Sequence, residues 1–373
     1  MTDPGPTGAE PTDAAPTPRL VPLPGSARPN AADQHPTNTV PPETPVEITV
    51  VLRRRGERPA DVAPMPADDY AAAYGADPAD VDAATQSLTR HGLRVIAADA
   101  ASRRIRVGGT AAAMGRVFGT TLGAVNGGTP GRRRSGGLSI PAELEGIVTA
   151  VLGLDDRPQT RARFQIAPAA MTTASYTPVE LGTVYKFPTN TDGTGQSIAI
   201  LELGGGYTQA DLDTYFTGLG LAAPTVTAVG VDGAGNTPEN DPNGPDGEVL
   251  LDIEVAGALA PKAAIAVYFA PNTDAGFLDA LSQAAHASPT PAAISISWGQ
   301  SEDAWTGQAR TAFDDALADA AGLGATVTAA AGDDGSTDRG TDAQPHADFP
   351  ASSPHALGCG GTTLDASGAT ITS

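Results

Sequence analysis

Two carboxylates lie four residues apart in a segment that otherwise predicts a buried helix. In GPDGEVLLDIEVAGALAP, residues 244–261, apolar side chains surround Glu248 and Asp252 on nearly every face of the helix. Like charges at this spacing repel by about a few tenths of a kcal/mol in water, and in apolar surroundings they must be partnered or protonated. Coupled carboxyls titrate jointly, one ionised while the other keeps its proton, which suits acid–base catalysis in acid.

The plain alternative is that both carboxylates are solvated or form salt bridges. Basic partners are scarce, because residues 166–373 contain 4 Lys and Arg against 25 Asp and Glu, whereas residues 1–165 contain 18 of each class. We therefore favour a functional pair. The excess negative charge also repels nucleic acid and anionic membranes. It indicates a protein suited to low pH, although an acidic surface that only aids solubility explains the charge equally well.

A third carboxyl of chemical interest is Asp333, which follows an apolar run in the sequence AAAGDDG. A carboxyl at the end of a buried strand tends to have a raised pKa and to stay protonated as a hydrogen-bond donor. The commoner role for such a residue is to cap the next turn.

Other motifs in the chain are weaker signals of a functional site. LELGGGY lacks the G-x-G-x-x-G pattern of a dinucleotide loop, and DPNGPDGE has its glycine at the wrong place for a calcium loop. Cys359, the single cysteine, is predicted to be a small core residue.

Apolar strands alternate with amphipathic helices through the second half of the chain, residues 176–373. The predicted strands lie within residues 196–206, 223–231, 263–271, 292–299 and 325–335. This alternation predicts a doubly wound parallel sheet covered by helices on both faces. Ligands bind such sheets beyond the carboxyl ends of the strands. Glu202, Trp298 and Asp333 all fall at such ends.

The first half has a different organisation. Residues 1–45 contain twelve prolines and few large apolar residues, so they are predicted to form a disordered tail. Residues 46–154 alternate strands and helices, which predicts a small ferredoxin-like α+β domain. Residues 155–175 lack periodicity and predict an interdomain linker.

Three local predictions concern the small domain. Residues 78–91 are predicted to form a helix capped by Asp77, with Pro78 at its first position. Residues 140–154 are predicted to form another helix. Residues 131–137, GRRRSGG, are predicted to form a loop that is protease-sensitive or binds acidic groups.

Taken in order, the motifs of residues 176–363 resemble those of the sedolisin family of serine-carboxyl peptidases, most closely its kumamolisin type. The matching stretches are IAILELGGGY, DPNGPDGEVLLDIEVAGALAP, AVYFAPNTDAGFLDA, SISWG, AAAGDDGSTD, DFPASSP and GCGGT. Residues 46–155 resemble the activation prodomain of that family more loosely, through VVLRR, VFG, IPAEL and VLGLD. The resemblance implies a partial subtilisin-like sheet, preceded by a ferredoxin-like prodomain. We expect the prodomain to be released in acid by cleavage within residues 155–175, where the sequence shows the least order.

The resemblance also implies roles for the candidate residues. Glu248 corresponds to the general base of the family, Asp252 to the acid that orients it, and Asp333 to the protonated acid of the oxyanion hole. Glu202 and Trp298 correspond to residues that extend the hydrogen-bond network behind the pair. A carboxylate base has a far lower pKa than histidine, and a carboxylic acid replaces neutral amides as oxyanion donor, so serine chemistry shifts into acid.

Asp348 corresponds to a position that lines the substrate cleft, and Asp334 stands where many relatives have serine. The S-G-T-S motif that carries the family's nucleophile does not occur in the 373 residues. The serines nearest to the matched motifs lack its context; they are Ser295, Ser297 and Ser336. The calcium ligands of the family also lie beyond Ser373. We therefore expect a truncated precursor of an acid endopeptidase that is inactive as given, with calcium bound only by the complete domain.

Two other classes remain open. One is a non-catalytic protein, in which the prodomain acts as a folding aid or inhibitor, or a pseudo-peptidase that only binds. The other is a dinucleotide oxidoreductase, which the motifs disfavour. For the peptidase, the expected partners are protein or peptide substrates and the prodomain in cis, with no nucleic acid and no membrane, and the protein is expected to be a monomer. The resemblance implies an extracellular protein, although no signal peptide is visible at the N-terminus.

Overall fold

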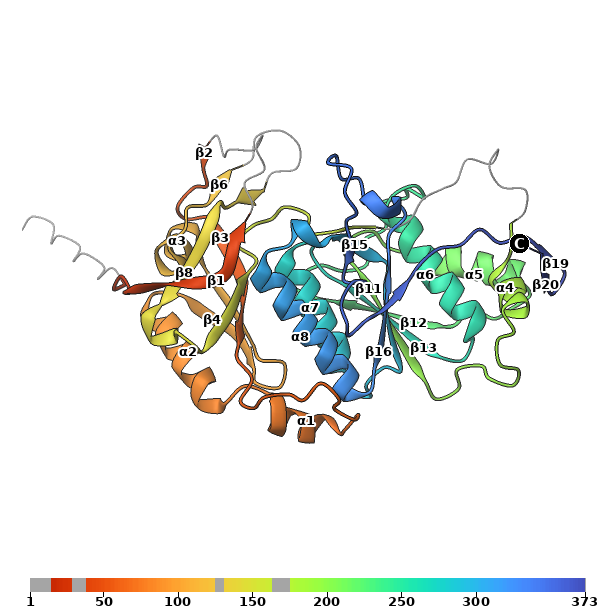
Figure 1. Ribbon diagram of the computed structural model, residues 1–373, viewed down its shortest axis with the longest axis horizontal. Coiled ribbons are helices and arrows are strands. Elements are labelled where there is room, and N and C mark those ends of the chain that lie inside the picture. Colours follow the sequence, from red (N-terminus) through yellow and green to blue (C-terminus); the bar gives the residue numbers. More distant parts are fainter. Residues whose placement is uncertain (1–14, 29–37, 125–130, 163–174, 373) are drawn as a thin grey trace, which may run out of the picture.

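The computed structural model describes residues 15–28, 38–124, 131–162 and 175–372, and it consists of two packed units (Figure 1). The second unit contains a six-stranded sheet in the order β12-β13-β11-β14-β16-β18, with every neighbouring pair parallel. Its strands are β11 (Ser197–Glu202), β12 (Thr225–Gly230), β13 (Ala264–Phe269), β14 (Ala293–Ile296), β16 (Thr326–Ala330) and β18 (Leu357–Cys359). Five of these were predicted as strands, and the parallel arrangement confirms the predicted class of sheet.

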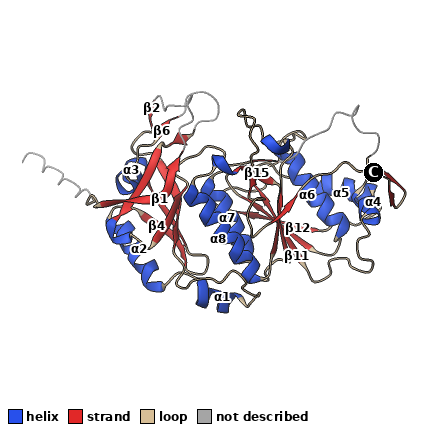
Figure 2. Cartoon of the chain, viewed as in Figure 1, coloured by secondary structure: helices blue, strands red, loops and turns tan. Residues whose placement is uncertain are grey.

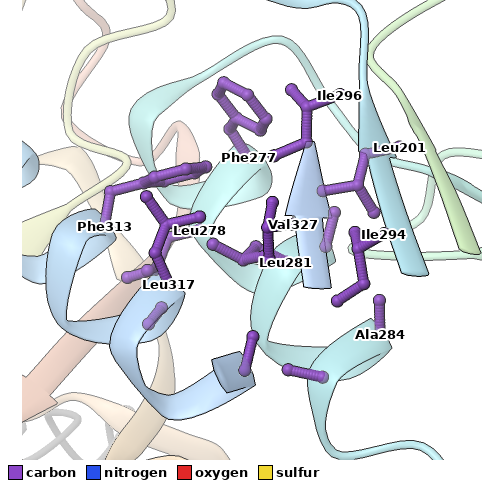
Figure 3. Packing of buried hydrophobic residues seen from close by; sticks show 14 of the residues in the cluster. Leu201, Phe277, Leu278, Leu281, Ala284, Ile294, Ile296, Phe313, Leu317 and Val327 are labelled. Atoms are coloured by element: carbon purple, nitrogen blue, oxygen red, sulfur yellow. The ribbon is translucent and has the colours of Figure 1, made fainter. Parts of the chain in front are cut away.

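Helices cover both faces of this sheet (Figure 2). The helices are α5 (Gln209–Gly218), α6 (Pro245–Leu259), α7 (Asp274–Ala285) and α8 (Gly307–Leu323), with the short α4 (Pro178–Val184) beside α6. On one face α7 and α8 bury Phe277, Leu281 and Phe313 against Leu201 and Ile294 (Figure 3). On the other face α5 and α6 bury a second cluster that includes Phe216, Val249 and Ile253. The strands are therefore apolar on both sides, as buried parallel strands require.

The first unit contains an antiparallel sheet in the order β4-β5-β3-β9. Its elements are β3 (Pro45–Leu52), α1 (Ala67–Tyr74), α2 (Pro78–Arg90), β4 (Arg94–Asp99), β5 (Arg104–Thr110), α3 (Ala111–Phe118) and β9 (Val148–Leu152). This order is the split β-α-β topology of ferredoxin-like folds that the sequence predicts. Helix α2 begins at Pro78, and the Asp77 carboxylate accepts a hydrogen bond from the Ala79 N–H, which confirms the predicted cap.

The predicted disordered tail is wrong for part of residues 1–45. Residues Leu20–Arg28 form strand β1, which pairs antiparallel with β8 (Gly136–Pro141), and Asn38–Thr39 form β2 beside β6 (Gly123–Ala124). Leu23 is buried, and the Ser26 hydroxyl accepts a hydrogen bond from the Leu138 N–H. A Pro-rich segment can therefore be ordered when a distant strand supplies its backbone partners.

Two further predictions in this unit are wrong in whole or in part. Residues 140–154 contain the end of β8, one 3₁₀ turn at Ala142–Leu144 and strand β9, rather than a helix, because Val148, Ala150 and Val151 pair with β3. Residues 131–137 are not all loop: β7 (Arg132–Arg133) lies there, and Arg134 is buried with its guanidinium donating to the Ser26 carbonyl oxygen at 2.8 Å. Arg132 forms an ion pair with Asp156, as the acid-binding alternative predicts, whereas protease sensitivity stays a prediction.

The predicted linker is ordered over its first eight residues, 155–162. Asp155 is buried and accepts two hydrogen bonds from the Arg157 guanidinium, at 2.8 and 2.6 Å. Residues Arg161–Ala162 form β10, which pairs antiparallel with β15 (Trp298–Ser301). The rest of the predicted linker, apart from Ser175, lies outside the described residues.

The two units meet along α7 and α8, which lie between the two sheets in Figure 1. The Gln308 side chain of α8 accepts a hydrogen bond from the Val151 N–H of β9 and donates one to its carbonyl oxygen, at 3.2 and 2.8 Å. Four arginines of the first unit form ion pairs with aspartates of the two helices: Arg28 with Asp274, Arg54 and Arg103 with Asp319, and Arg104 with Asp279. Hydrogen bonds and several ion pairs therefore hold the interface between the two units.

Candidate active site

The candidate residues gather at the carboxyl edge of the parallel sheet. Strands β11, β14 and β16 are neighbours there. Glu202 ends β11, Ser297 and Trp298 directly follow β14, and Asp333 lies three residues beyond β16. Because these strands are parallel, their ends lie at the same edge, as the sequence predicts.

Helix α6 brings the carboxylate pair to this edge. Asp246, in its first turn, is buried, and its carboxylate accepts hydrogen bonds from the backbone N–H groups of Gly206, Glu239 and Asp241, at 2.8, 2.8 and 3.2 Å. These bonds tie the start of α6 to the glycine turn after β11 and to the long loop before the helix. Asp246 was not predicted as a site residue, because an acidic residue in the first turn of a helix is its only distinguishing feature in the sequence.

Glu202 is fully buried at the centre of the cluster. The Trp298 indole Nε1–H donates a hydrogen bond to Glu202 Oε2 at 2.8 Å. Burial raises the pKa of Glu202 well above its ordinary value, and the nearby Asp252 and Glu248 raise it further, although the Trp298 hydrogen bond opposes them. Glu202 is therefore suited to remain a protonated, neutral carboxylic acid.

Glu248 and Asp252 lie on successive turns of α6. Glu248 is buried, and Asp252 is partly buried. Ser297 Oγ lies 2.7 and 2.9 Å from the two Asp252 carboxylate oxygens and donates a hydrogen bond to them. Burial raises the pKa of Asp252, and the Ser297 hydrogen bond lowers it. The structure thus places three carboxyls, one hydroxyl and one indole N–H in a single cluster.

Asp333 lies at the same edge but is exposed, so the apolar surroundings that the sequence predicts for it are absent. Its neighbour Asp334 forms an ion pair with Arg339, with Oδ1 2.7 Å from Nε. The ion pair gives Asp334 a local partner. The family resemblance implies a serine at this position in many relatives. Cys359, predicted to lie in the core, is also exposed, at the edge strand β18.

Asp348 is buried in the short strand β17 (Asp348–Phe349), which pairs antiparallel with β15. Its carboxylate lies directly over Gly299 of β15, where an added Cβ would be only 2.0 Å from Oδ1. Because residue 299 is a glycine, Asp348 can approach β15, the strand that begins at Trp298. This places Asp348 beside the strand that carries Trp298, and its role in lining a substrate cleft stays a prediction.

A histidine holds the loop that connects Asp333 to Asp348. His346 lies between two carboxylates, with Nδ1 2.7 Å from Asp303 Oδ2 and Nε2 2.9 Å from Asp342 Oδ1. The hydrogen bonds to Asp342 and to Asp303 raise the pKa of His346. The contact is therefore strongest in moderate acid, where the imidazolium and both carboxylates are charged.

This histidine leads to a prediction about the loop. A raised pKa means that the stabilisation is fully present below the ordinary pKa of histidine and is lost as pH rises through the raised value. Because intrinsic amide exchange itself speeds up with pH, the quantity to follow is the protection factor, the intrinsic exchange rate divided by the observed one. We expect the protection factors of residues 336–347 to fall over that pH range, and His346→Gln to remove this fall. His286→Gln, at the residue that follows α7, is the matched control. Equal exchange in His346→Gln and the parent chain would refute the role of His346.

Within the described residues, no group of three or more His, Cys, Asp or Glu side chains is arranged to hold a metal ion. Calcium therefore remains a prediction for the complete catalytic domain, and no step of the proposed chemistry depends on it. No helix in the described part of the chain is long and apolar enough to span a membrane.

Comparisons with known proteins match both units. The family model "Pro-kumamolisin, activation domain" matches residues 33–157. Kumamolisin from Bacillus sp. (strain MN-32) is 46% identical over 314 residues, covering 76% of this chain and 56% of that protein. Tripeptidyl-peptidase sed5 from Aspergillus fumigatus (strain ATCC MYA-4609 / CBS 101355 / FGSC A1100 / Af293) is 27% identical over 334 residues, covering 75% and 56%. The solved structure of Pseudomonas sedolisin, a serine-carboxyl proteinase complexed with two molecules of pseudo-iodotyrostatin, is 25% identical, covers 53% of this chain and 56% of that chain, and has a TM-score of 0.47.

The fold and the matches define an α/β unit preceded by an activation domain. The chain belongs to the sedolisin family of serine peptidases, in the kumamolisin group. It spans about half the length of the curated relatives it matches. The activation-domain match begins at residue 33, within the segment predicted to be a tail.

Proposed function

We propose that this chain is the precursor form of a secreted, acid-acting serine-carboxyl endopeptidase with a subtilisin-like catalytic domain. The observation that carries the proposal is the buried cluster of Glu202, Glu248 and Asp252. Among the described residues, neither Glu202 nor Asp252 forms an ion pair with a lysine or arginine. A fold that buries carboxyls without a basic counter-charge, as at Glu202 and Asp252, loses stability, so these two positions are better explained by chemistry than by structure.

In the proposed reaction, Glu248 removes the proton from a serine hydroxyl while the serine oxygen attacks the carbonyl carbon of the peptide. Asp252 orients Glu248, and Asp333, protonated in acid, donates a hydrogen bond to the oxyanion. Glu248 then gives the proton to the leaving amine, and a water molecule hydrolyses the acyl-enzyme by the same proton route. The serine of the S-G-T-S motif is not among the 373 residues.

The end of the first unit supports a peptide as the ligand of this site. Strand β10 pairs Arg161 with Gly299 and Ala162 with Trp298, so extended backbone of the chain itself lies beside the carboxyl cluster. Just upstream, the Asn272 side chain accepts a hydrogen bond from the Thr160 N–H at 3.0 Å and donates one to its carbonyl oxygen at 2.8 Å. Extended peptides bind sheet edges by the same backbone pairing. We infer that the prodomain blocks the site in cis until it is cleaved.

The proposal predicts a sharp contrast between two polypeptides. The pure 373-residue chain is expected to show no hydrolysis of casein or peptides in acid, because it lacks the nucleophile and forms no acyl-enzyme. If the reading frame continues past codon 373 to a G-T-S segment, the extended protein is expected to be active in acid. Turnover by the 373-residue chain would contradict the proposed nucleophile, and a stop codon at that point would favour the inhibitor or pseudo-peptidase alternative.

A further inference from the structure

Ser297 is a hydroxyl in the cluster to which the proposed chemistry gives no role. It lies between β14 and β15, and its Oγ is within hydrogen-bond distance of both Asp252 oxygens, at 2.7 and 2.9 Å. A serine hydroxyl has one proton to donate, whereas an ionised carboxylate only accepts. The geometry therefore favours a negatively charged Asp252.

The surroundings of Glu202 favour the neutral, protonated form instead. Its Oε2 accepts the Trp298 hydrogen bond, but its Oε1 is buried without a hydrogen-bond partner in the described part of the chain. An unsatisfied oxygen on a buried carboxylate is costly, so Glu202 is better accommodated as a neutral acid. The titratable groups that act on Glu202 are Asp252 and Glu248, both from α6, and each opposes a negative charge on Glu202.

We propose that Ser297 is a positioning residue that keeps the negative charge on Asp252 and leaves the proton of the cluster on Glu202. This inference assigns a residue to the site on which the proposed function rests. In that function, a charged Asp252 orients Glu248 and stabilises its protonated form during the reaction. Without the hydroxyl, Asp252 takes up a proton at higher pH and loses that effect in the acid where the enzyme works.

The test needs no catalysis, so its failure can be distinguished from failure of the proposed function. The chain contains two tryptophans, Trp298 and Trp305, and Trp298 is hydrogen-bonded to Glu202. In a Trp305→Phe background, tryptophan emission followed from neutral pH into acid reports protonation of the cluster. Ser297→Ala is expected to move the midpoint of this titration upward by about one pH unit, as for loss of one hydrogen bond to a charged group.

Two variants serve as controls. Ser297→Thr retains the hydroxyl and is expected to keep the parent midpoint. Ser295→Ala makes the same substitution two residues earlier in β14, where the described structure shows no hydrogen bond to a carboxylate, and is also expected to keep it. Thermal unfolding of each variant verifies that it is folded. An unchanged midpoint in Ser297→Ala, or equal shifts in the alanine and threonine variants, would overturn the proposal, because either result means that the hydroxyl does not set the charge.

Discussion

Replacing Glu248 with alanine is expected to reduce turnover by the complete, active protein by several orders of magnitude, as loss of the general base does in other serine peptidases. The variant has no group to accept the serine proton, and no other carboxyl of the cluster is available, since Glu202 keeps its own proton and Asp252 accepts from Ser297. The measurement is kcat/KM on a peptide substrate in acid. In the proposed reaction the oxyanion donor is a carboxylic acid, so the parent enzyme is expected to lose activity as pH rises towards neutrality.

Glu254→Ala is a matched control for this experiment. Glu254 is on the same helix and partly buried, and burial and then the nearby Asp211 of α5 raise its pKa to about 7. Like Glu248, it is a carboxyl on α6 that is shielded from solvent, but it lies near α5 rather than at the sheet edge. Activity of Glu254→Ala is expected to remain near that of the parent. If Glu248→Ala keeps comparable activity, or if the pH optimum is neutral, the assignment of Glu248 as base is wrong.

The sequence predicted the parallel sheet and the edge at which the candidate residues meet. The reason is local: apolar strands with glycine or polar ends alternate with helices whose caps are visible, so segments such as residues 196–206 and 274–287 carry their own signal. It also predicted the Glu248 and Asp252 pair, since two carboxylates among apolar residues violate a simple rule of burial.

The missed features depend on contacts between distant segments. Strand β1 exists because β8, more than a hundred residues later, supplies its backbone partners, and the segment 140–154 is extended because β3 pairs with it. Ser297 meets Asp252 only after β14 and α6 have packed together. No periodicity in the sequence reports such pairings, so proline content and apolar runs led to a tail and a helix instead.

The contact between prodomain and catalytic unit centres on one buried aspartate, Asp319 of α8. Its carboxylate is bonded to Arg54 of the first unit, and it accepts a hydrogen bond from Arg103 at 2.9 Å and from the Tyr70 hydroxyl at 2.7 Å. Burial by itself raises the pKa of Asp319, but Arg103 and Arg54 outweigh it and hold the pKa below its ordinary value. Removing one partner of a buried ion pair leaves the other charge uncompensated.

Asp319→Asn is therefore expected to destabilise the docked prodomain by about 3–5 kcal/mol, because Arg103 and Arg54 lose their buried counter-charge. Denaturant unfolding of the 373-residue chain at neutral pH measures the loss. Asp315→Asn is the control, since Asp315 pairs with the same two arginines but its side chain is 42% exposed, and its loss is expected to cost less than about 1 kcal/mol. Equal effects of the two substitutions would mean that burial of Asp319 does not determine the strength of the contact.

The same residue predicts how the precursor responds to acid. Because the pKa of Asp319 is lowered in the docked state, its stabilisation is complete above the ordinary aspartate value of about 4 and is lost as pH falls through the lowered value. The parent chain should therefore lose stability below about pH 4, and the stability of Asp319→Asn should depend less on pH over that range.

In the complete protein, acid incubation is expected to release the prodomain by cleavage within residues 163–175, since residues 155–162 are held by the buried Asp155 and by β10. Sequencing of the new N-terminus after acidification tests this directly. A mature product that begins before residue 163, or a precursor that is active while uncleaved, would show that docking at Asp319 and β10 does not control activation.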